Sequence, residues 1–308
     1  MIPTSGPPGS VTVRAPAKIN LHLGVGAPRG DGFHPLLTVY HAIGIYDDVT
    51  VRPSDSWRLT VETAPYLDVT AVPLGDDNIV VRAATLLADL HGVPAHADVL
   101  IRKEIPVAGG MAGGSADAAA VLVALDRLWG LDTSDEDMFR LAAELGSDVP
   151  FALMGGNVLG TGRGEVVESV RGGDVVRWWV VVTAREGLST PAVYRRFDAM
   201  AADASPRPSP PHRLVAFLAD PVEAITGLLH NDLQEPALDL RPELRDVLAA
   251  GEKAGALAGL VSGSGPTCVF LCSSADHARG VAAGLDGVGE HVLVANGPVA
   301  GAHVVEHA

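Results

Sequence analysis

The amino-acid sequence predicts an α+β protein with two lobes. Three observations lead to this prediction. Apolar residues alternate in several short segments, as they do in half-buried strands. Longer apolar segments end at Gly92, Gly130 and Gly146, and a closing glycine is typical of helices. The chain has 308 residues, enough for one large or two ordinary domains, and we expect domains at 1–163 and 164–308.

The expected elements follow in chain order. Alternation and apolar runs predict strands at 11–25, 36–53, 57–63, 97–105, 176–184 and 268–272, and a hairpin within 155–170. Longer periodic segments predict helices at 78–92, 118–130, 132–146, 225–238, 244–256 and 278–287. Thr133, with Glu136 three residues later, predicts a capping box at the third helix. The Pro-rich stretch 203–211 predicts a loop.

Composition limits the function classes. The chain carries 22 basic and 37 acidic residues, a net charge of −15, and no basic tract that could neutralise nucleic-acid phosphates, so we expect no nucleic-acid partner. No apolar run is long enough to span a membrane, and the first residues lack the pattern of a signal peptide, so we expect no membrane association. Cys268 and Cys272 are expected to be buried free thiols. A cytoplasmic location and a monomer or weak homodimer fit this composition.

The segment "PVAGGMAGGSADAAA", residues 106–120, is the strongest functional signal. It lies between a predicted strand and a predicted helix, where glycines let the backbone approach a phosphate and the first N–H groups of the helix are free. It matches neither GxxxxGK[ST] nor GxGxxG. A glycine loop that serves only packing remains an alternative on this segment alone.

The chain resembles the superfamily of galactokinase, homoserine kinase and mevalonate kinase. Residues 106–120 are similar to the second motif of these enzymes, "APAKINLHLGV" to the first and "VSGSGPTCVFL" to the third, in the same order along the chain. The resemblance implies an N-terminal domain with left-over-right βα topology, a ferredoxin-like C-terminal domain and a glycine loop that wraps ATP. The loop residues implied are Pro106, Val107, Ala108, Gly109, Gly110, Met111, Ala112, Gly113, Gly114, Ser115 and Ala116.

A narrower resemblance comes from "GAPRGDGFHP", "GSDVPF", "STPAVY" and "NDLQ". Together with "PAKIN" they are similar to the 4-diphosphocytidyl-2-C-methyl-D-erythritol kinase family of the non-mevalonate isoprenoid pathway. This implies ATP and Mg²⁺ as cofactors and a small cytidine diphosphate substrate, phosphorylated on its 2-hydroxyl. Where the family often has two serines at the end of the loop, this chain has Ser115 and Ala116, so Ser115, Asp117 or water has to replace the second hydroxyl. No protein metal-ligand set is assigned.

The same resemblance places Lys18 and Asp148 at the reacting groups. A lysine in a strand is usually solvated, but Lys18 shares its strand face with Asn20 and His22. The implied role of its charge is to stabilise the transferring phosphoryl group. Asp148 follows a helix, where an aspartate usually caps or turns the chain. The implied role is to accept the proton of the substrate hydroxyl.

The implied substrate site has a cytidine end. Phe33 and Tyr194 would offer faces to the base, and His34 would bind its polar edge. Asn20 and the turn residues Gly263, Ser264 and Gly265 would shape the rest of the substrate site. "TGRGE" is interpreted only as a hairpin turn.

Three other functions remain open at this point. A homoserine or mevalonate kinase would share the motifs but would not explain the cytidine-end residues. A dinucleotide-binding oxidoreductase would need an acidic ribose partner about 20 residues after the loop. A nucleotide-binding module without activity would not need Lys18 and Asp148.

Overall fold

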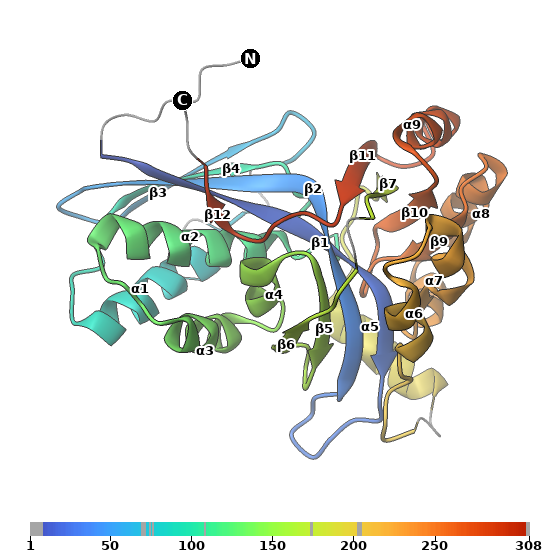
Figure 1. Ribbon diagram of the computed structural model, residues 1–308, viewed down its shortest axis with the longest axis horizontal. Helices are drawn as coiled ribbons and strands as arrows, with labels where there is room; N and C mark the ends of the chain where they lie inside the picture. Colours follow the sequence, from blue (N-terminus) through green and yellow to red (C-terminus); the bar gives the residue numbers. More distant parts are fainter. Residues whose placement is uncertain are drawn as a thin grey trace.

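The computed structural model describes residues 9–68, 72, 73, 75, 77–107, 109–172, 175–201 and 205–305. Two sheets lie next to each other, and helices pack on both (Figure 1). The larger sheet comes mainly from the N-terminal half of the chain and the smaller one from the C-terminal half. The predicted α+β class is therefore confirmed.

The larger sheet has eight strands, and five of them run in the order β12-β1-β2-β4-β3. β1 and β2 form a long antiparallel pair, and β3 runs parallel to β4. β5 pairs with β2 and β6, and β8 runs parallel to β1. The bounds are β1 Val11–Val25, β2 Leu36–Arg52, β3 Arg58–Thr63, β4 Asp98–Lys103, β5 Asn157–Thr161, β6 Val166–Ser169, β8 His230–Asn231 and β12 His303–Val304.

β1 carries the first group of functional candidates. Its apolar residues, such as Val13, Ile19 and Leu21, are fully buried, as alternation predicts. Lys18 and Asn20 on the other parity are also buried, with 5 % and 2 % exposed. The second face of this strand is therefore covered by other parts of the chain, and polar groups in such a place need partners.

Four helices lie on one side of the larger sheet (Figure 1). They are α1 Ile79–His91, α2 Gly113–Trp129, α3 Asp135–Leu145 and α4 Val149–Met154. α2 and α4 pack against the strands of this sheet, and α1 and α3 pack against these two helices. The alanines of α2, including Ala116 and Ala118 to Ala120, are fully buried, and their small side chains let the helix lie close to β1 and β2. The predicted capping box at Thr133 is wrong by one residue, because Ser134 caps α3 by accepting the Asp137 N–H, while the Thr133 hydroxyl contacts His91.

The smaller sheet is antiparallel, in the order β11-β7-β10-β9. Its strands are β7 Arg177–Thr183, β9 Ala258–Val261, β10 Cys268–Cys272 and β11 His291–Gly297. With helices between β7 and β9, and α9 Ala275–Gly284 between β10 and β11, this is the ferredoxin-like arrangement that the family resemblance implies. Cys268 and Cys272 are buried free thiols, as expected.

Several helices connect β7 to β9. They are α5 Thr190–Met200, α6 His212–Phe217, the 3₁₀-helix η2 Val222–Leu228, α7 Gln234–Leu240 and α8 Leu244–Lys253. The single helix predicted at 225–238 is wrong, because β8 interrupts it. There Asn231 donates to the carbonyls of Val261 and Gly263, and these tertiary hydrogen bonds override the helical pattern. Part of the Pro-rich stretch, 205–211, is coil, and residues 203 and 204 lie outside the described residues.

Residue 163, the predicted boundary, lies in the turn between β5 and β6, both strands of the larger sheet. The chain passes to the smaller sheet between Ser169 and Arg177. It returns to the larger sheet twice, at β8 and at β12, both of which pair with β1. A division into independent domains at 163 stays a prediction.

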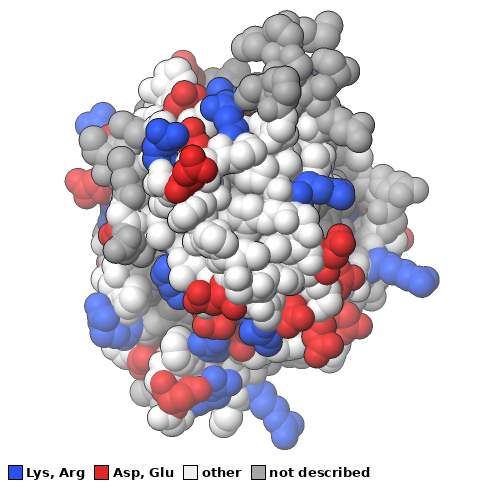
Figure 2. All heavy atoms as spheres, turned by 90° about the vertical axis from the view of Figure 1, so that its left-hand side faces the viewer, with Lys and Arg blue, Asp and Glu red and all other residues white. Residues whose placement is uncertain are grey.

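No helix in the described ranges has the length and apolar composition to cross a membrane. On the face shown in Figure 2, acidic and basic side chains are interspersed around an uncharged centre.

Candidate active site

A cavity of about 990 Å³ collects most of the residues that the sequence singled out. Its walls come from β1, the glycine loop with the start of α2, the start of α5 and the turn between β9 and β10. The predicted site residues that line it are Lys18, Asn20, Phe33, His34, Pro106, Val107, Gly109, Gly110, Ala112, Gly113, Gly114, Ser115, Asp148, Tyr194, Gly263, Ser264 and Gly265.

Among the described loop residues of the prediction, two do not line this cavity. Met111 and Ala116 are fully buried in the apolar core, so their side chains hold the loop on the sheet. Any contact of these two residues with a ligand would have to come from their backbone. Ala108 lies outside the described residues.

The glycine loop connects β4 to α2 and packs tightly against the turn 262–265. Gly110 has a φ of +75°, and a Cβ atom there would lie 2.4 Å from the Ser262 carbonyl oxygen. Ala112, at the N-cap of α2, also has a positive φ and offers no side-chain cap. The first N–H groups of α2 therefore have no capping side chain, the arrangement in which a helix N-terminus binds an anion.

Lys18 is the central cation of the cavity. Its Nζ donates to Asn20 Oδ1 at 2.7 Å and to the Gly110 carbonyl at 3.1 Å, and it lies 3.9 Å from Asp148 Oδ2. Asn20 in turn donates to Thr38, which fixes its amide. Burial lowers the pKa of Lys18, and the charge of Asp148 partly offsets this. The ammonium is thus held in one place and desolvated, which strengthens its effect on nearby charge.

Asp148 is placed at the N-cap position of α4, as its ordinary interpretation predicted. Its side chain makes no capping hydrogen bond, however, and it lines the cavity beside Lys18. Tyr40 of β2 lies near this pair, and the centre of its ring is 5.9 Å from Lys18 Nζ. Burial, together with the nearby Asp148 carboxylate, raises the pKa of Tyr40 well above its usual range, so the phenol stays neutral.

The other end of the cavity is aromatic. The rings of His34 and Tyr194 lie 5.0 Å apart, centre to centre. His34 Nδ1 contacts the Gly26 carbonyl at 2.8 Å, and Nε2 lies 3.5 Å from Asp198 Oδ1. A carbonyl only accepts, so Nδ1 carries a proton and donates it to Gly26. Burial raises the pKa of the Tyr194 phenol.

Phe33 differs from Tyr194 in its surroundings. It is 50 % exposed at the rim of the cavity, and the Arg163 guanidinium lies over its ring, 4.9 Å from the centre. Both aromatic residues line the same cavity, but each is paired with a different neighbour, Phe33 with Arg163 and Tyr194 with His34.

The turn 262–265 closes the cavity from the side of the smaller sheet. A Cβ atom on Gly263 would lie 3.1 Å from Lys18 Nζ and would crowd the ammonium, and the φ of +57° at this residue also favours glycine. The Ser264 hydroxyl contacts the Thr190 hydroxyl at 2.8 Å, which connects this turn to the first turn of α5. Asn231 donates to the Gly263 carbonyl and fixes the turn from outside the cavity.

Sequence reasoning missed two residues of the aromatic end. Asp198 lies four residues after Tyr194 on α5, and this spacing, which puts both on one helix face, was a usable signal. Arg163 lies in the "TGRGE" turn, which is a hairpin turn as predicted but also lines the cavity. No local pattern distinguishes such an arginine from an ordinary turn residue.

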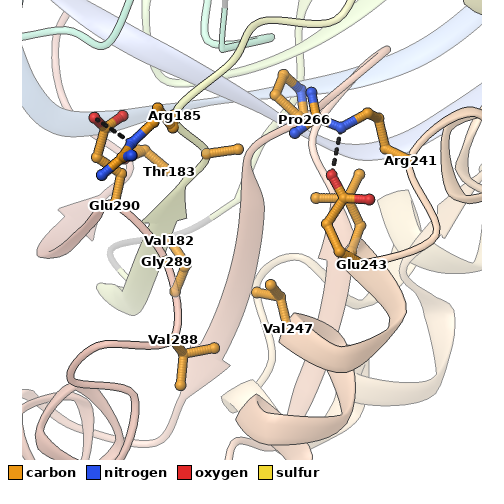
Figure 3. A pocket seen from close by; sticks show the side chains of 12 residues that line it. Val182, Thr183, Arg185, Arg241, Glu243, Val247, Pro266, Val288, Gly289 and Glu290 are labelled. Carbon is orange, nitrogen blue, oxygen red and sulfur yellow. Dashed lines mark hydrogen bonds and ion pairs between the residues drawn. The ribbon is translucent and has the colours of Figure 1, made fainter.

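A second cavity, of about 280 Å³, lies beside Pro266, at the far end of the same turn (Figure 3). Valines form one side, and two charge pairs lie around it, Arg185 with Glu290 and Arg241 with Glu243. Because these charges face one another, no uncompensated group there calls for a charged ligand.

The comparisons with known proteins agree with this geometry. Residues 78–156 match the model of the GHMP kinases N terminal domain, and residues 215–291 match that of the GHMP kinases C terminal. A 4-diphosphocytidyl-2-C-methyl-D-erythritol kinase of a Nocardioides species is 63 % identical over 298 residues, which are 96 % of this chain and 100 % of that protein. The kinase of the same name from Mycolicibacterium smegmatis is 52 % identical, over 96 % of this chain and 93 % of the relative.

Solved structures give the same result. A crystal structure of 4-(cytidine 5'-diphospho)-2C-methyl-D-erythritol kinase matches with a TM-score of 0.76 and 33 % identity, over 92 % of this chain and 98 % of the other. A homoserine kinase from Cytophaga hutchinsonii matches with a TM-score of 0.72 over 98 % and 99 % of the two chains, but at 20 % identity it shows the fold alone. The chain belongs to the GHMP kinases and, within them, to the 4-diphosphocytidyl-2-C-methyl-D-erythritol kinase family.

Proposed function

We propose that this chain transfers the γ-phosphoryl group of ATP to the 2-hydroxyl of 4-diphosphocytidyl-2-C-methyl-D-erythritol. The observation that carries the proposal is one cavity with three chemically distinct parts: a glycine loop at a helix N-terminus, the Lys18–Asp148 pair and the His34–Tyr194 pair. Homoserine and mevalonate, the substrates of the two alternative kinases, carry no nucleobase that the His34–Tyr194 pair could bind.

The glycine loop is proposed to hold the ATP phosphates. The backbone N–H groups at the start of α2 provide donors and the positive end of the helix dipole. A Cβ atom on Gly114 would meet only Ile79, at 3.9 Å, so the space next to this residue belongs to the cavity. Close approach of a phosphate to the backbone is therefore possible there.

Lys18 and Asp148 are proposed as the catalytic residues. Lys18 stabilises the negative charge of the phosphoryl group during transfer, because its ammonium is desolvated and fixed by Asn20 and Gly110. Asp148 accepts a hydrogen bond from the attacking hydroxyl and orients it. Because the transition state of phosphoryl transfer is loose, orientation contributes at least as much as removal of the proton.

The aromatic end is proposed to select cytosine. His34 Nε2 lies 3.5 Å from Asp198 Oδ1, and both residues line the cavity. In the tautomer with a proton on Nδ1 alone, Nε2 accepts hydrogen bonds, as the carboxylate of Asp198 does. The cytosine N4 amino group has two hydrogens to donate, whereas a uracil-type base presents its O4 acceptor at that position. A uridine analogue would thus bring a third acceptor, its O4 atom, next to His34 Nε2 and the Asp198 carboxylate, with no proton to share among them. Tyr194 and Phe33 provide ring faces for either base.

Mg²⁺ is proposed as the companion of ATP. Mg²⁺ prefers oxygen ligands and is often bound by one or two carboxylates together with phosphates and water. Asp148 lines the cavity and offers a carboxylate, which would hold the ion together with phosphate oxygens and water. The described residues contain no cluster of three or more His, Cys, Asp or Glu that could hold it alone. When bound, the ion neutralises charge on the phosphates.

The test is a panel of alcohols with ATP and Mg²⁺, in which ADP release is followed. The panel contains the cytidine substrate, its uridine analogue, homoserine and mevalonate. We expect the highest kcat/KM for the cytidine substrate. A higher kcat/KM for homoserine or mevalonate would contradict the proposal.

A further inference from the structure

Three ionisable side chains are buried together beneath the phosphate loop. Lys103, at the end of β4, donates from Nζ to Asp47 Oδ2 at 2.6 Å and to Asp117 Oδ2 at 2.5 Å. The exposed fractions of the three side chains are 3 %, 0 % and 5 %. Burial of such groups costs free energy that apolar residues would not cost.

The group connects the two ends of the phosphate loop. Asp47 Oδ1 accepts the backbone N–H groups of Glu104 and Ile105, the last residues before the loop. Asp117 belongs to α2, which begins directly after the loop. Lys103 therefore joins the entry of the loop, through Asp47, to its exit, through Asp117.

The group also lies next to the space for the phosphates. Lys103 and Asp117 both line the large cavity, and a Cβ atom on Gly113 would be 3.6 Å from Lys103 Nζ. If both carboxyls were ionised, the group would have a net negative charge there and would repel ATP. Burial raises the pKa of Asp117 well above its usual range, with Lys103 acting in the opposite direction and Asp47 in the same direction.

The hydrogen bonds indicate which carboxyl holds a proton. Asp47 accepts three N–H groups, so both of its oxygens act as acceptors. Asp117 accepts through Oδ2 alone, and its buried Oδ1 has no partner in the described part of the chain. A proton on Asp117 Oδ1 makes the group neutral.

We propose that Asp47, Lys103 and Asp117 are positioning residues for ATP, which clamp the two ends of the phosphate loop, with Asp117 acting as a neutral acid. The inference rests on the proposed binding of ATP at this loop. Its consequence is an asymmetry between the two aspartates. Asparagine resembles a protonated aspartate, so it can replace Asp117 but not Asp47, where an amide group would point N–H at another N–H.

The experiment measures ATP affinity by calorimetry, and the KM values for ATP and for the cytidine substrate, in Asp47→Asn and Asp117→Asn. The matched control is Asp48→Asn, on the same strand, which loses only a partly exposed ion pair with Arg14. We expect Asp47→Asn to weaken ATP binding by about tenfold or more, and Asp117→Asn by less than about threefold. The KM for the cytidine substrate should change little in either variant.

Wild-type ATP affinity in a folded Asp47→Asn variant would overturn the clamp. Equal weakening in both variants would overturn the neutral acid. If Asp47→Asn does not fold, Asp117→Ala is compared with Asp117→Asn, because alanine removes the contact with Lys103 and asparagine keeps it. Only alanine should weaken ATP binding, and equal affinities would overturn the inference. If the wild-type chain binds ATP but phosphorylates none of the alcohols, the proposed function is contradicted, and the comparison of the variants remains valid. If the wild-type chain does not bind ATP, the proposed function and the inference about the clamp are both overturned.

Discussion

Replacement of Lys18 by methionine removes one charge from the cavity and keeps most of the buried stem. In the native chain the ammonium contacts Asn20 and Gly110 and lies 3.9 Å from the Asp148 carboxylate. After Lys18→Met these acceptors face one another and the phosphates without a counter-charge. We expect the protein to fold and its turnover to fall.

The expected size of this loss follows from the geometry. Two unit charges at the Lys18–Asp148 distance interact by about 4 kcal/mol at an effective dielectric constant of about 20. Loss of one preorganised donor from an active site costs about 2.7–4 kcal/mol, or ~10²–10³ in kcat. Both values point to a decrease in kcat of ~10²–10³, with a smaller change in the KM for ATP because backbone N–H groups still bind the phosphates.

The assay follows ADP release at saturating ATP and cytidine substrate, and a thermal melt tests whether the variant is folded. The matched control is Lys253→Met, because Lys253 is exposed at the end of α8. Its kcat should equal that of the wild type. A folded Lys18→Met variant with a kcat within threefold of the wild type would refute the role given to this ammonium.

Three further predictions concern the same cavity. Gly114→Val should leave the melting temperature unchanged, because an added Cβ atom meets only Ile79. It should weaken ATP binding at least ~10-fold by calorimetry, because the side chain occupies the proposed phosphate site, and an unchanged affinity would contradict that assignment. Tyr194→Ala should lower kcat/KM for the cytidine substrate and its uridine analogue by similar factors, whereas His34→Ala should narrow the ratio between them; an unchanged ratio in His34→Ala would remove this histidine from base selection. Because the pKa of Lys18 is lowered, its ammonium loses its proton at a lower pH than the ammonium of an ordinary lysine. We therefore expect kcat/KM to decline on the alkaline side at a pH below the pKa of an ordinary lysine. In Lys18→Arg this alkaline decline should disappear, and a decline that persists would belong to another group.

Local patterns in the sequence predicted most of the elements. The strands β1, β2, β7 and β10 follow alternation or apolar runs, and α1 ends at Gly92 as expected. The error at 225–238 has a different origin, because the conformation there depends on hydrogen bonds from Asn231 to a turn 30 residues away. Contacts of that range leave no local pattern.

The candidate site was predictable to the extent that motifs carry it. Lys18, Asp148 and most of the glycine loop lie together as the motifs implied. The side-chain directions within the loop were not predictable, because only packing shows that Met111 and Ala116 face the core. Asp47, Lys103 and Asp117 come from three distant segments, so their contact appears only in the folded chain.

The most direct test of the central claim locates the phosphate that the enzyme adds. In the substrate named here, C2 carries a methyl group and no hydrogen, so a phosphate on its oxygen has no three-bond coupling to a proton. The wild-type chain with ATP, Mg²⁺ and this substrate should give a product whose new phosphomonoester signal in proton-coupled ³¹P NMR is a singlet, together with one equivalent of ADP. A new signal split by proton coupling, or release of inorganic phosphate alone, would contradict the account.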